Sequence, residues 1–409
     1  MEWKEVRLGD VCDLIAGFAF KAKDFGEFPT KVIKIGDIKP PFVDYVGQVG
    51  VDISNYDINR LSKYTVKYGD YVLAMTGATI GKVGKYISKN FSYINQRVLK
   101  FSPKQNVDAD YINYIICSNI FAKYVVNYVD SESAQPNISA STISKFAFQI
   151  PSEKDDQRRI ASILSSLDRK IELNNKINAD LEEMAQSIFK NWFVDFEPFK
   201  DGKFVDSELG MIPEGWKVGT IGDIVEFQNG FTFSSKDFSE NGEYKIITIK
   251  SVQDGCLVTE GSSKVTEYPT KMPAYCKLQS GDILLSLTGN VGRCCLVTET
   301  NLLLNQRVAK IKAKECYDNS FSYALFRLKE TKELLISISR GTAQANLSPV
   351  EASKLPMVIP SEDARKSFSM ISDSIMNKII SIHIENSRIS LLRDTLLPRL
   401  MSGELEVPE

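Results

Sequence analysis

The sequence lacks several residue patterns on which common enzyme and metal sites depend. It holds a single histidine, His383, so histidine-ligated metal sites and Ser-His-Asp triads are excluded. Its seven cysteines include no C-x-x-C pair, which is typical of reduced thiols that pack in a protein core. No apolar run is long enough to cross a bilayer, and the first residues have no signal-peptide core. We therefore expect a cytoplasmic protein without a membrane partner.

Two short motifs resemble catalytic signatures, but each lacks an essential part. Residues 77–82, Gly-Ala-Thr-Ile-Gly-Lys, are one residue shorter than a phosphate-binding loop and have no Ser or Thr after the lysine. Residues 39–42, Lys-Pro-Pro-Phe, have the shape of the Asn-Pro-Pro-aromatic motif of adenine methyltransferases but lack its amide. We interpret both stretches as turns or loops. The sequence therefore predicts a non-catalytic chain with no catalytic residues, no metal and no cofactor of its own.

Glycine and proline are absent from residues 157–193, which predicts one uninterrupted helix about 50 Å long. Apolar residues dominate a stripe with alternating spacings of four and three residues. Its members are Ile160, Leu164, Leu167, Ile171, Asn174, Asn178, Leu181, Ala185, Ile188 and Trp192. A stripe this narrow needs a partner helix, and a second one with the same spacing runs from Phe368 to Leu400, at an offset of 208.

The two stripes predict an antiparallel coiled coil with pseudo-twofold symmetry. Asn174, Asn178 and Asn386 interrupt the apolar pattern, and Asn178 and Asn386 occupy the same repeat position. A buried polar pair near the middle would fix the register and the orientation of the helices. The alternative is that each amphipathic helix packs only on its own domain.

The whole chain repeats itself with a period near 210 residues, which indicates an internal duplication. Among the repeated segments, Trp3-Lys4 recurs as Trp216-Lys217, and Asn95-Gln96-Arg97-Val98 recurs as Asn305-Gln306-Arg307-Val308. Each unit is expected to be a domain of about 150 residues followed by a long helix. The predicted boundaries are residues 1–150 for the first domain, 151–213 for the central helix and linker, 214–358 for the second domain and 359–409 for the last helix.

Short alternating stretches bounded by Gly-Asp and Thr-Gly turns predict strands within each domain. Residues 110–126 and 320–338 are predicted to be helices. The fold class is therefore α+β, with two tandem-repeat domains, each built on a mixed and mostly antiparallel sheet, and two long helices. Residues 197–214 contain two prolines and two glycines and are expected to be a linker.

Because no catalytic pattern is found, we expect the chain to recognise a ligand. A net charge of −2 does not by itself favour nucleic-acid binding, but loops with aromatic, amide and basic residues suit a DNA groove. The candidate DNA-binding residues are Phe18, Phe20, Lys21, Lys39, Arg60, Lys63, Thr76, Thr79, Lys82, Phe231, Phe233, Lys250, Lys264, Lys271, Thr288, Asn290 and Arg293.

Residues that both repeats share should position the DNA backbone or hold the fold, whereas residues that differ should specify bases. Base reading is therefore expected in the divergent stretches Lys39–Lys67 and Lys250–Lys277. The shared pairs Gln96-Arg97 and Gln306-Arg307 have the chemistry to read adenine and guanine. For Asn95 and Arg97 we favour a structural role.

The order of these motifs resembles the DNA-specificity (S) subunit of type I restriction-modification systems. The signatures include Gly-Phe-x-Phe, Asn-Gln-Arg-Val and Ala-Gln-x-Asn-(Ile/Leu)-Ser in both repeats, and Leu397-Pro398-Arg399-Leu400 near the end. The resemblance covers essentially the whole chain. One departure lies in the second repeat, where Lys366-Ser367-Phe368 stands in place of Gln157-Arg158-Arg159.

The resemblance implies that residues 1–150 and 214–358 are target-recognition domains, each reading half of a bipartite double-stranded DNA sequence. The coiled coil would be the spacer and the docking surface for DNA adenine methyltransferase (M) subunits, two in number, within a complex that also holds restriction and translocase (R) subunits. S-adenosylmethionine, ATP and Mg would be bound by those partners. Two alternatives are a coiled-coil scaffold with two ligand-binding lobes, and a Mg²⁺-dependent nuclease that uses scattered Asp and Glu.

Overall fold

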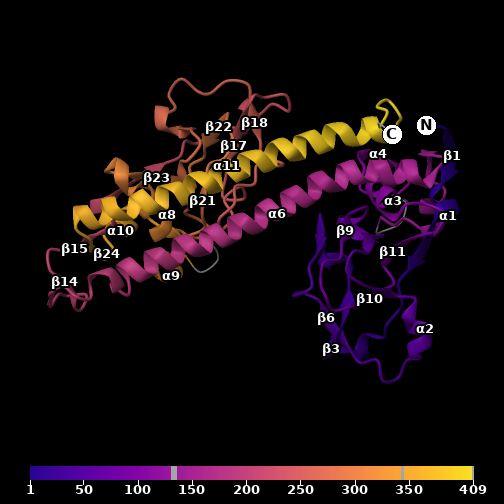
Figure 1. Ribbon diagram of the computed structural model, residues 1–409, viewed down its shortest axis with the longest axis horizontal. Coiled ribbons are helices and arrows are strands. Elements are labelled where there is room, and N and C mark those ends of the chain that lie inside the picture. Colours follow the sequence, from indigo (N-terminus) through magenta and orange to yellow (C-terminus); the bar gives the residue numbers. More distant parts are fainter. Residues whose placement is uncertain (130–135, 342–344, 408–409) are drawn as a thin grey trace. The chain divides into compact units, whose positions relative to one another are not determined.

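The computed structural model describes residues 1–129, 136–341 and 345–407 (Figure 1). The chain divides into two compact units, which are described separately. Unit 1 comprises Met1–Lys170 and Ile389–Glu409, and unit 2 comprises Ile171–Arg388. Each unit therefore holds a globular part and stretches of both long helices, α6 (Lys154–Phe193) and α11 (Glu362–Met401). None of the helices in the described ranges is long and apolar enough to span a membrane.

The globular part of unit 1 is built on two larger sheets and a strand pair. A six-stranded sheet has the order β2 (Cys12–Ala16), β11 (Val98–Pro103), β8 (Tyr71–Ala74), β9 (Val83–Lys85), β5 (Phe42–Val43) and β4 (Ile38–Lys39). A four-stranded sheet has the order β6 (Val49–Val51), β3 (Phe25–Ile33), β10 (Ser92–Ile94) and β7 (Thr65–Val66). The pair consists of β1 (Trp3–Arg7) and β12 (Ala147–Pro151).

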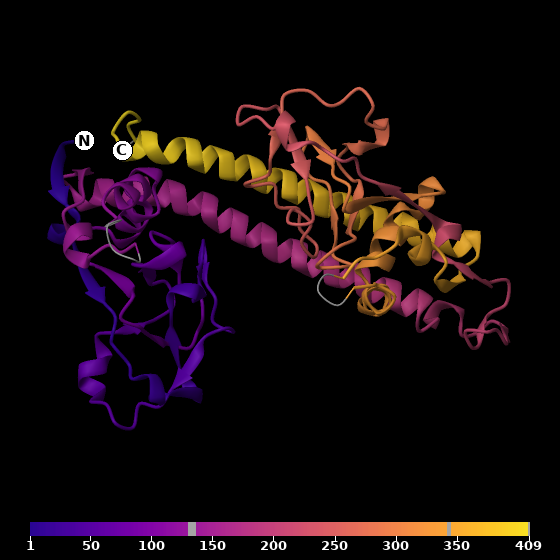
Figure 2. The same ribbon diagram turned by 180° about the vertical axis from the view of Figure 1, so that it is seen from behind.

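Unit 2 repeats this strand order in two four-stranded sheets, without counterparts to β5 and β4 among the residues that the structure describes. Figure 2 shows the ribbon from behind. One sheet has the order β16 (Val225–Asn229), β23 (Val308–Ala313), β20 (Ile283–Ser286) and β21 (Cys294–Leu296). The other has the order β18 (Lys264–Val265), β17 (Tyr244–Ile247), β22 (Leu302–Leu304) and β19 (Lys277–Leu278), and β15 (Lys217–Thr220) pairs with β24 (Pro356–Ile359). Strands β3 and β10, β17 and β22, and β5 and β9 pair in parallel, and the other pairings are antiparallel. The duplicated α+β fold is thereby confirmed.

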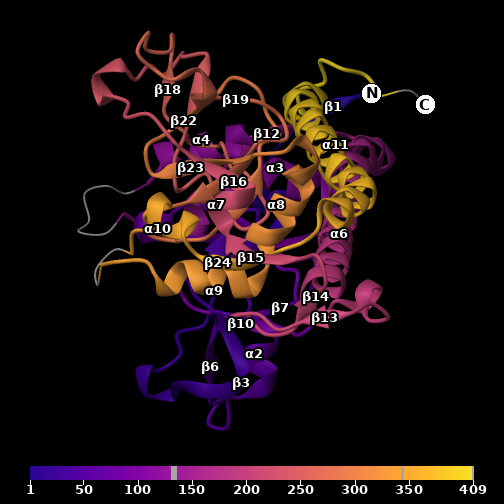
Figure 3. The same cartoon turned by 90° about the vertical axis from the view of Figure 1, so that its left-hand side faces the viewer.

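Short helices complete both units. Unit 1 contains α1 (Leu8–Val11), α2 (Ile58–Ser62), α3 (Ala109–Ile116), α4 (Asn119–Asn127) and α5 (Ala140–Ser144), and unit 2 contains α7 (Ile221–Ile224), α8 (Asn319–Arg327), α9 (Lys329–Ser337) and α10 (Pro349–Ser353). Figure 3 shows α8 and α9 of unit 2 from the side.

Two of the predicted helices are each broken into two. In unit 1 the Ser118 side chain accepts a hydrogen bond from the Phe121 N–H (3.2 Å), so α4 starts afresh after α3. In unit 2 Leu328 is extended, with φ −64° and ψ 134°, and separates α8 from α9. The first break is two residues long, Cys117 and Ser118, and the second is Leu328 alone. Neither contains glycine or proline, so the usual helix-breaking residues do not mark them in the sequence.

The expected linker, residues 197–214, has structure of its own within unit 2. It contains a 3-10 turn (Glu197–Phe199) and a hairpin of β13 (Phe204–Val205) and β14 (Ile212–Pro213). The Phe199 ring lies against the Trp216 ring, with centroids 4.9 Å apart. Aromatic burial thus fixes a segment that its glycines and prolines alone would leave loose.

The long helices pair in antiparallel layers, as their stripes predict. In unit 1, Ile160 and Leu400 share one core cluster. In unit 2, the Asn174 Nδ2 donates to the Asn386 Oδ1 (2.8 Å), and the Trp192 and Phe368 rings lie 6.0 Å apart. The sum of the two residue numbers is the same in each of these layers, which only antiparallel helices in one register produce.

The buried asparagines of unit 2 do not pair as their repeat positions suggest. The Asn386 side chain contacts Asn174 and also donates to the Asn175 Oδ1 (2.9 Å), whereas neither amide atom of Asn178 has a hydrogen-bond partner among the residues that the structure describes. Equivalent residues of two antiparallel helices meet only on the symmetry axis. By the constant sum of residue numbers, the residue opposite Asn178 is the buried Ile382. One of two equivalent layers is therefore an amide pair, and the other is not.

This asymmetry predicts opposite effects for two similar substitutions. Asn178→Leu removes a buried unpartnered amide and should raise the free energy of unfolding by about 1–2 kcal/mol. Asn174→Leu leaves the buried Asn386 amide without its donor and should lower the free energy by about 1–3 kcal/mol. Urea unfolding of both variants measures the difference, and equal effects of the same sign would contradict this reading of the two layers.

Candidate nucleic-acid interface

In each unit, the segments that both repeats share meet at one edge of a sheet. Strand β11 runs antiparallel to both of its neighbours, β2 and β8, so the end of β2, the start of β11 and the end of β8 lie together. Backbone hydrogen bonds close this edge: the Gly17 N–H donates to the Val98 carbonyl (2.9 Å), and the Met75 N–H donates to the Arg97 carbonyl (2.9 Å). Unit 2 has the same bonds, from Gly230 to Val308 (3.2 Å) and from Leu287 to Arg307 (3.1 Å).

A fourth shared segment reaches the same edge. The Gly77 N–H donates to the Pro136 carbonyl (3.1 Å) in unit 1, and the Gly289 N–H donates to the Ala345 carbonyl (2.9 Å) in unit 2. We call this surface the repeat edge; it comprises residues 17–20, 75–82, 95–97 and 136–137 in unit 1, and 230–233, 287–293, 305–307 and 345–346 in unit 2. The repeated motifs are thus far apart in the sequence and adjacent in the fold.

The first glycine of the Gly-Phe-x-Phe motif is required by close packing at the repeat edge. A Cβ atom on Gly17 would lie 2.2 Å from the Asn95 carbonyl oxygen, and one on Gly230 would lie 2.1 Å from the Asn305 carbonyl oxygen. The Asn95 Oδ1 in turn accepts a hydrogen bond from the Gln96 N–H (2.6 Å). Contacts of this kind support a structural role for Asn95.

The aromatic residues of this motif are directed into the cores rather than towards a ligand. Phe20 is buried, and Phe18 lies in a cluster of rings with centroids 5.5 Å from Tyr56 and 5.4 Å from Tyr64. In unit 2, Phe231 and Phe233 pack against two separate clusters of buried aliphatic residues. Stacking on bases requires a free ring face, so the geometry favours packing for these four residues.

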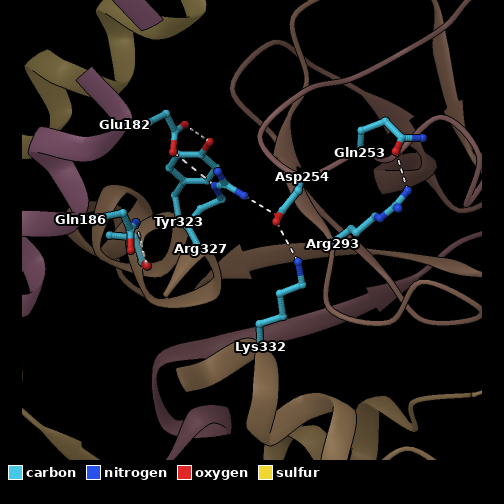
Figure 4. A network of polar contacts seen from close by, with 9 residues as sticks. Glu182, Gln186, Gln253, Asp254, Arg293, Tyr323, Arg327 and Lys332 are labelled. Carbon is cyan, nitrogen blue, oxygen red and sulfur yellow. Dashed lines mark hydrogen bonds and ion pairs between the residues drawn. The ribbon is translucent and has the colours of Figure 1, made fainter. Parts of the chain in front are cut away.

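The turn that begins with threonine presents only some of its predicted residues. Thr76 and Thr288 are buried, Thr79 is half-buried, and Lys82 and Asn290 are exposed. The Thr288 hydroxyl donates to the Asn346 Oδ1 (2.8 Å). Arg293, the counterpart of Lys82, is half-buried and donates to the Gln253 Oε1 (Figure 4). This turn therefore offers Lys82 and Asn290 to a ligand.

The arginines of the Asn-Gln-Arg-Val motif were not among the candidate residues, yet the structure exposes them. Arg97 and Arg307 are both exposed at the repeat edge, and no carboxylate of the described chain forms an ion pair with either. Gln96 and Gln306 are also exposed, and the Gln306 Oε1 accepts a hydrogen bond from Thr232 (2.7 Å). The available signal was the recurrence of a charged residue in both repeats, which packing alone does not require.

In the divergent stretch of unit 1, the predicted cations lie on aromatic rings or beside acids. Arg60 lies 5.7 Å from the centroid of the Phe18 ring, and Lys63 lies 4.9 Å from that of Tyr64. Lys39 forms an exposed ion pair with Asp44 (2.6 Å), a kind of pair that adds little stability. Lys21 is exposed, and its backbone N–H donates to the Tyr56 hydroxyl (3.1 Å). Phe18, Lys21, Arg60 and Lys63 therefore gather around one aromatic cluster.

The predicted cations of unit 2 are more dispersed. Lys250 and Lys271 are exposed, and Lys264 is half-buried on strand β18. Lys277, which ends the divergent stretch, lies 5.6 Å from the centroid of the Tyr244 ring and 5.1 Å from that of Tyr268. In unit 1 Arg60 lies on the Phe18 ring of the Gly-Phe-x-Phe motif, whereas in unit 2 Lys277 lies on rings outside that motif.

The described residues include no cluster of three or more His, Cys, Asp or Glu side chains arranged to hold a metal ion. His383 lies on α11 in unit 2, where burial lowers the pKa of its imidazole. The expectation that the cysteines pack in a core holds for only part of the set: Cys12, Cys276, Cys294 and Cys295 are buried, whereas Cys117, Cys256 and Cys316 are exposed. Burial raises the pKa of Cys12 to about 12, which makes it a poor nucleophile.

Comparisons with known proteins agree with this geometry. A family model of the type I restriction modification DNA specificity domain matches residues 1–183 and 213–389. The MjaIX specificity subunit of a type I restriction enzyme from Methanocaldococcus jannaschii is 29% identical over 344 residues, which cover 83% of this chain and 78% of that protein. The HindI specificity subunit from Haemophilus influenzae is 25% identical over 469 residues, which cover 99% of this chain and all (100%) of that protein.

A solved structure shows the same fold. The S subunit of a type I restriction-modification system from M. genitalium aligns with a TM-score of 0.52 at 15% sequence identity, over 98% of this chain and 96% of that one. Because the family model matches both repeats and most of the chain, the protein belongs to the type I restriction-modification DNA specificity family, as its motifs predict.

Proposed function

We propose that this chain reads a bipartite, asymmetric double-stranded DNA target, one half with the globular part of each unit, and performs no catalysis itself. The observation that carries the proposal is the contrast within each unit between a shared exposed edge and a divergent neighbouring stretch. Both units present Gln-Arg pairs on the same strand framework, whereas the segments that follow β3 and β17 differ in structure. One framework with two different surfaces suits two different half-sites.

The shared repeat edge positions the DNA backbone. Arg97 and Arg307 are exposed cations without an acidic partner among the described residues, so no existing ion pair must break when they meet phosphate. Contacts with phosphate fix orientation and carry no sequence information. An arginine at the same position in both units therefore agrees with a role that both half-sites require.

The divergent stretches read the bases. In unit 1 this stretch forms the β4–β5 hairpin, which extends the six-stranded sheet, and carries the exposed Lys39 and Phe42. In unit 2 the corresponding residues form a loop outside the sheets, with Lys250 exposed. Amide, basic and apolar side chains at these positions can distinguish base edges in the major groove.

The long helices supply the spacer and the docking surface for two methyltransferase subunits. Helices α6 and α11 each contain 40 residues, which corresponds to about 60 Å. Met184 on α6 and Leu392 on α11 occupy the same repeat position, and they are 52% and 49% exposed. Equivalent apolar residues on the surface of both helices suit two copies of one partner. The partners would bring S-adenosylmethionine, and the restriction subunits would bring ATP and Mg.

Selection of bound DNA from a random pool tests the proposed function. The full chain, in complex with the methyltransferase subunits of its own system, should enrich a two-part asymmetric sequence with a fixed gap. Exchanging residues 214–358 for those of a relative should then change one half and leave the other unchanged. An intact complex that enriches no sequence at low salt would contradict DNA reading and favour a scaffold.

The proposed phosphate contacts predict a change in the salt dependence of binding. Arg97→Gln and Arg307→Gln should each weaken binding and reduce the slope of log K against log salt by about 1, with the preferred sequence unchanged. Arg388→Gln, which removes an exposed arginine from α11, is the matched control and should leave the slope as it is. A loss of sequence preference with an unchanged slope would assign these arginines to the bases instead.

A further inference from the structure

The loop that follows β17 in unit 2 is short and is held by few backbone hydrogen bonds. Within it, the Val258 N–H donates to the Ser251 carbonyl (2.8 Å), and the Gln253 N–H donates to the Cys256 carbonyl (3.0 Å). From its tip, Gly255 donates one backbone hydrogen bond to the Cys294 carbonyl of β21 (2.8 Å). We call residues 250–258 the reading loop, because they begin the divergent stretch of unit 2.

A chain of ion pairs ties the reading loop to the long helix α6 (Figure 4). The Arg327 Nε, on α8, donates to the Glu182 Oε2 on α6 (3.2 Å), and the Nη1 of the same guanidinium donates to the Asp254 carboxylate in the loop. From α9, Lys332 pairs with the other oxygen of Asp254 (2.7 Å). One arginine thus bridges a helix of the coiled coil and the tip of the loop.

The end of the bridge on α6 is buried, and both oxygens of the Glu182 carboxylate accept a hydrogen bond there. The side chains of Arg327 and Glu182 are only 17% and 16% exposed, and the Tyr323 hydroxyl donates to the second oxygen of Glu182. Burial, and secondarily the Glu182 charge, raises the pKa of Tyr323 well above its usual value, so the phenol remains a donor. A guanidinium with two carboxylate partners in fixed positions is a rigid link.

The loop end of the bridge is adapted to the guanidinium. Burial raises the pKa of Asp254, but Lys332 and Arg327 outweigh it and hold that pKa below its usual value, so the carboxylate stays charged. Gly255 has a φ of +79°, and a Cβ atom there would lie 2.9 Å from the Arg327 Nη2. The turn therefore brings the backbone directly onto the guanidinium. A second tie, from Arg293 to Gln253, comes from the repeat edge.

Unit 1 has no counterpart to this bridge among its described residues. Its equivalent of Tyr323 is Tyr114, which donates to the Asp168 Oδ2 on α6 (2.6 Å), and Asp168 pairs with Arg393 on α11 (2.8 Å). That network ends on the long helices. The β4–β5 hairpin, which takes the place of the reading loop, is held instead by backbone pairing with β9 at Phe42 and Lys85.

We propose that Arg327 is a positioning residue for base recognition by unit 2: it fixes the reading loop against Glu182 and α6. Unit 1 achieves the same result with sheet hydrogen bonds. The proposal rests on the proposed function, since it assigns the loop to the reading of one half-site. Arg327 itself touches no DNA in this account, and its effect on specificity passes through Asp254.

The test compares the two half-sites of the selected target in one complex. Binding is measured for DNA with single mismatches in the half assigned to unit 2 and in the half assigned to unit 1. Arg327→Met and Asp254→Ala should each reduce discrimination against mismatches about tenfold in the unit 2 half, and by less than about twofold in the unit 1 half. Glu333→Ala, which removes an exposed ion pair with Lys329 on α9 (3.7 Å), is the matched control and should change neither half.

Loss of Arg327 leaves the buried Glu182 without a cation, which can unfold a protein. The variant Asp254→Ala avoids this problem because the Asp254 side chain is 44% exposed, and the double variant Glu182→Gln/Arg327→Met removes the charge imbalance. Unchanged discrimination in the unit 2 half by folded Asp254→Ala and by the double variant would overturn the positioning role. If the wild-type complex enriches no two-part target, the proposed function fails first, and the positioning role fails with it.

Discussion

The layered pairing of α6 with α11 is the interaction on which the rest of this structure depends. In unit 1, Ile160 and Leu164 of α6 and Leu400 of α11 belong to the same core as the sheet and α3. In unit 2, Phe189, Phe193 and Phe368 from the two helices join the core beneath α8. Neither globular part completes its core without both helices, so the helices are structural parts of each unit.

This dependence explains why the end of the chain belongs to unit 1. Residues 389–409 lie far from residue 1 in the sequence, yet Gly403 comes so close to the Trp3 ring that a Cβ atom would lie 2.8 Å from it. The repeat is therefore not simply two domains in a row. Each unit combines a globular part with a part of α6 and a part of α11.

The duplication shows which features the two units have in common and which features distinguish them. The strand order, the Gly-Asn contact and the exposed Gln-Arg pair occur in both units, as expected if both share one framework and, in the proposed function, one way of contacting the DNA backbone. The stretch after β3 and β17 differs, and its support differs as well: sheet hydrogen bonds in unit 1 and the Arg327 bridge in unit 2.

Features that depend on period and repetition could be predicted from the sequence, and features that depend on single contacts could not. The stripe from Ile160 to Trp192 predicted that α6 pairs with α11 in antiparallel orientation, because a period of 3.5 residues has only one buried face. It did not predict that Asn386 meets Asn174 and not Asn178. The breaks at Ser118 and Leu328 left no such signal, since the helical pattern continues through them.

The candidate site shows the same division. The loop that contains Phe18 and Phe20 has the composition of a recognition loop, but both rings pack in a core. The sequence alone does not show this packing. In the bridge of Glu182, Arg327 and Asp254, each bonded pair is at least 73 positions apart in the sequence, and no local pattern relates the three residues. The Gln-Arg pairs could have been chosen from the sequence, because their charge recurs where packing does not demand it.

The most direct test is to lengthen α6 and α11, the proposed spacer, by one heptad each. Seven residues would be inserted at equivalent layers of both α6 and α11, which keeps the apolar faces aligned and adds about 10 Å, or about three base pairs of DNA. Insertion into α6 alone is the control, and it should lose stability because the layers no longer match. The account predicts that the double insertion lengthens the gap in the selected target and leaves both half-sites unchanged; a folded double-insertion complex that selects the original gap would contradict it.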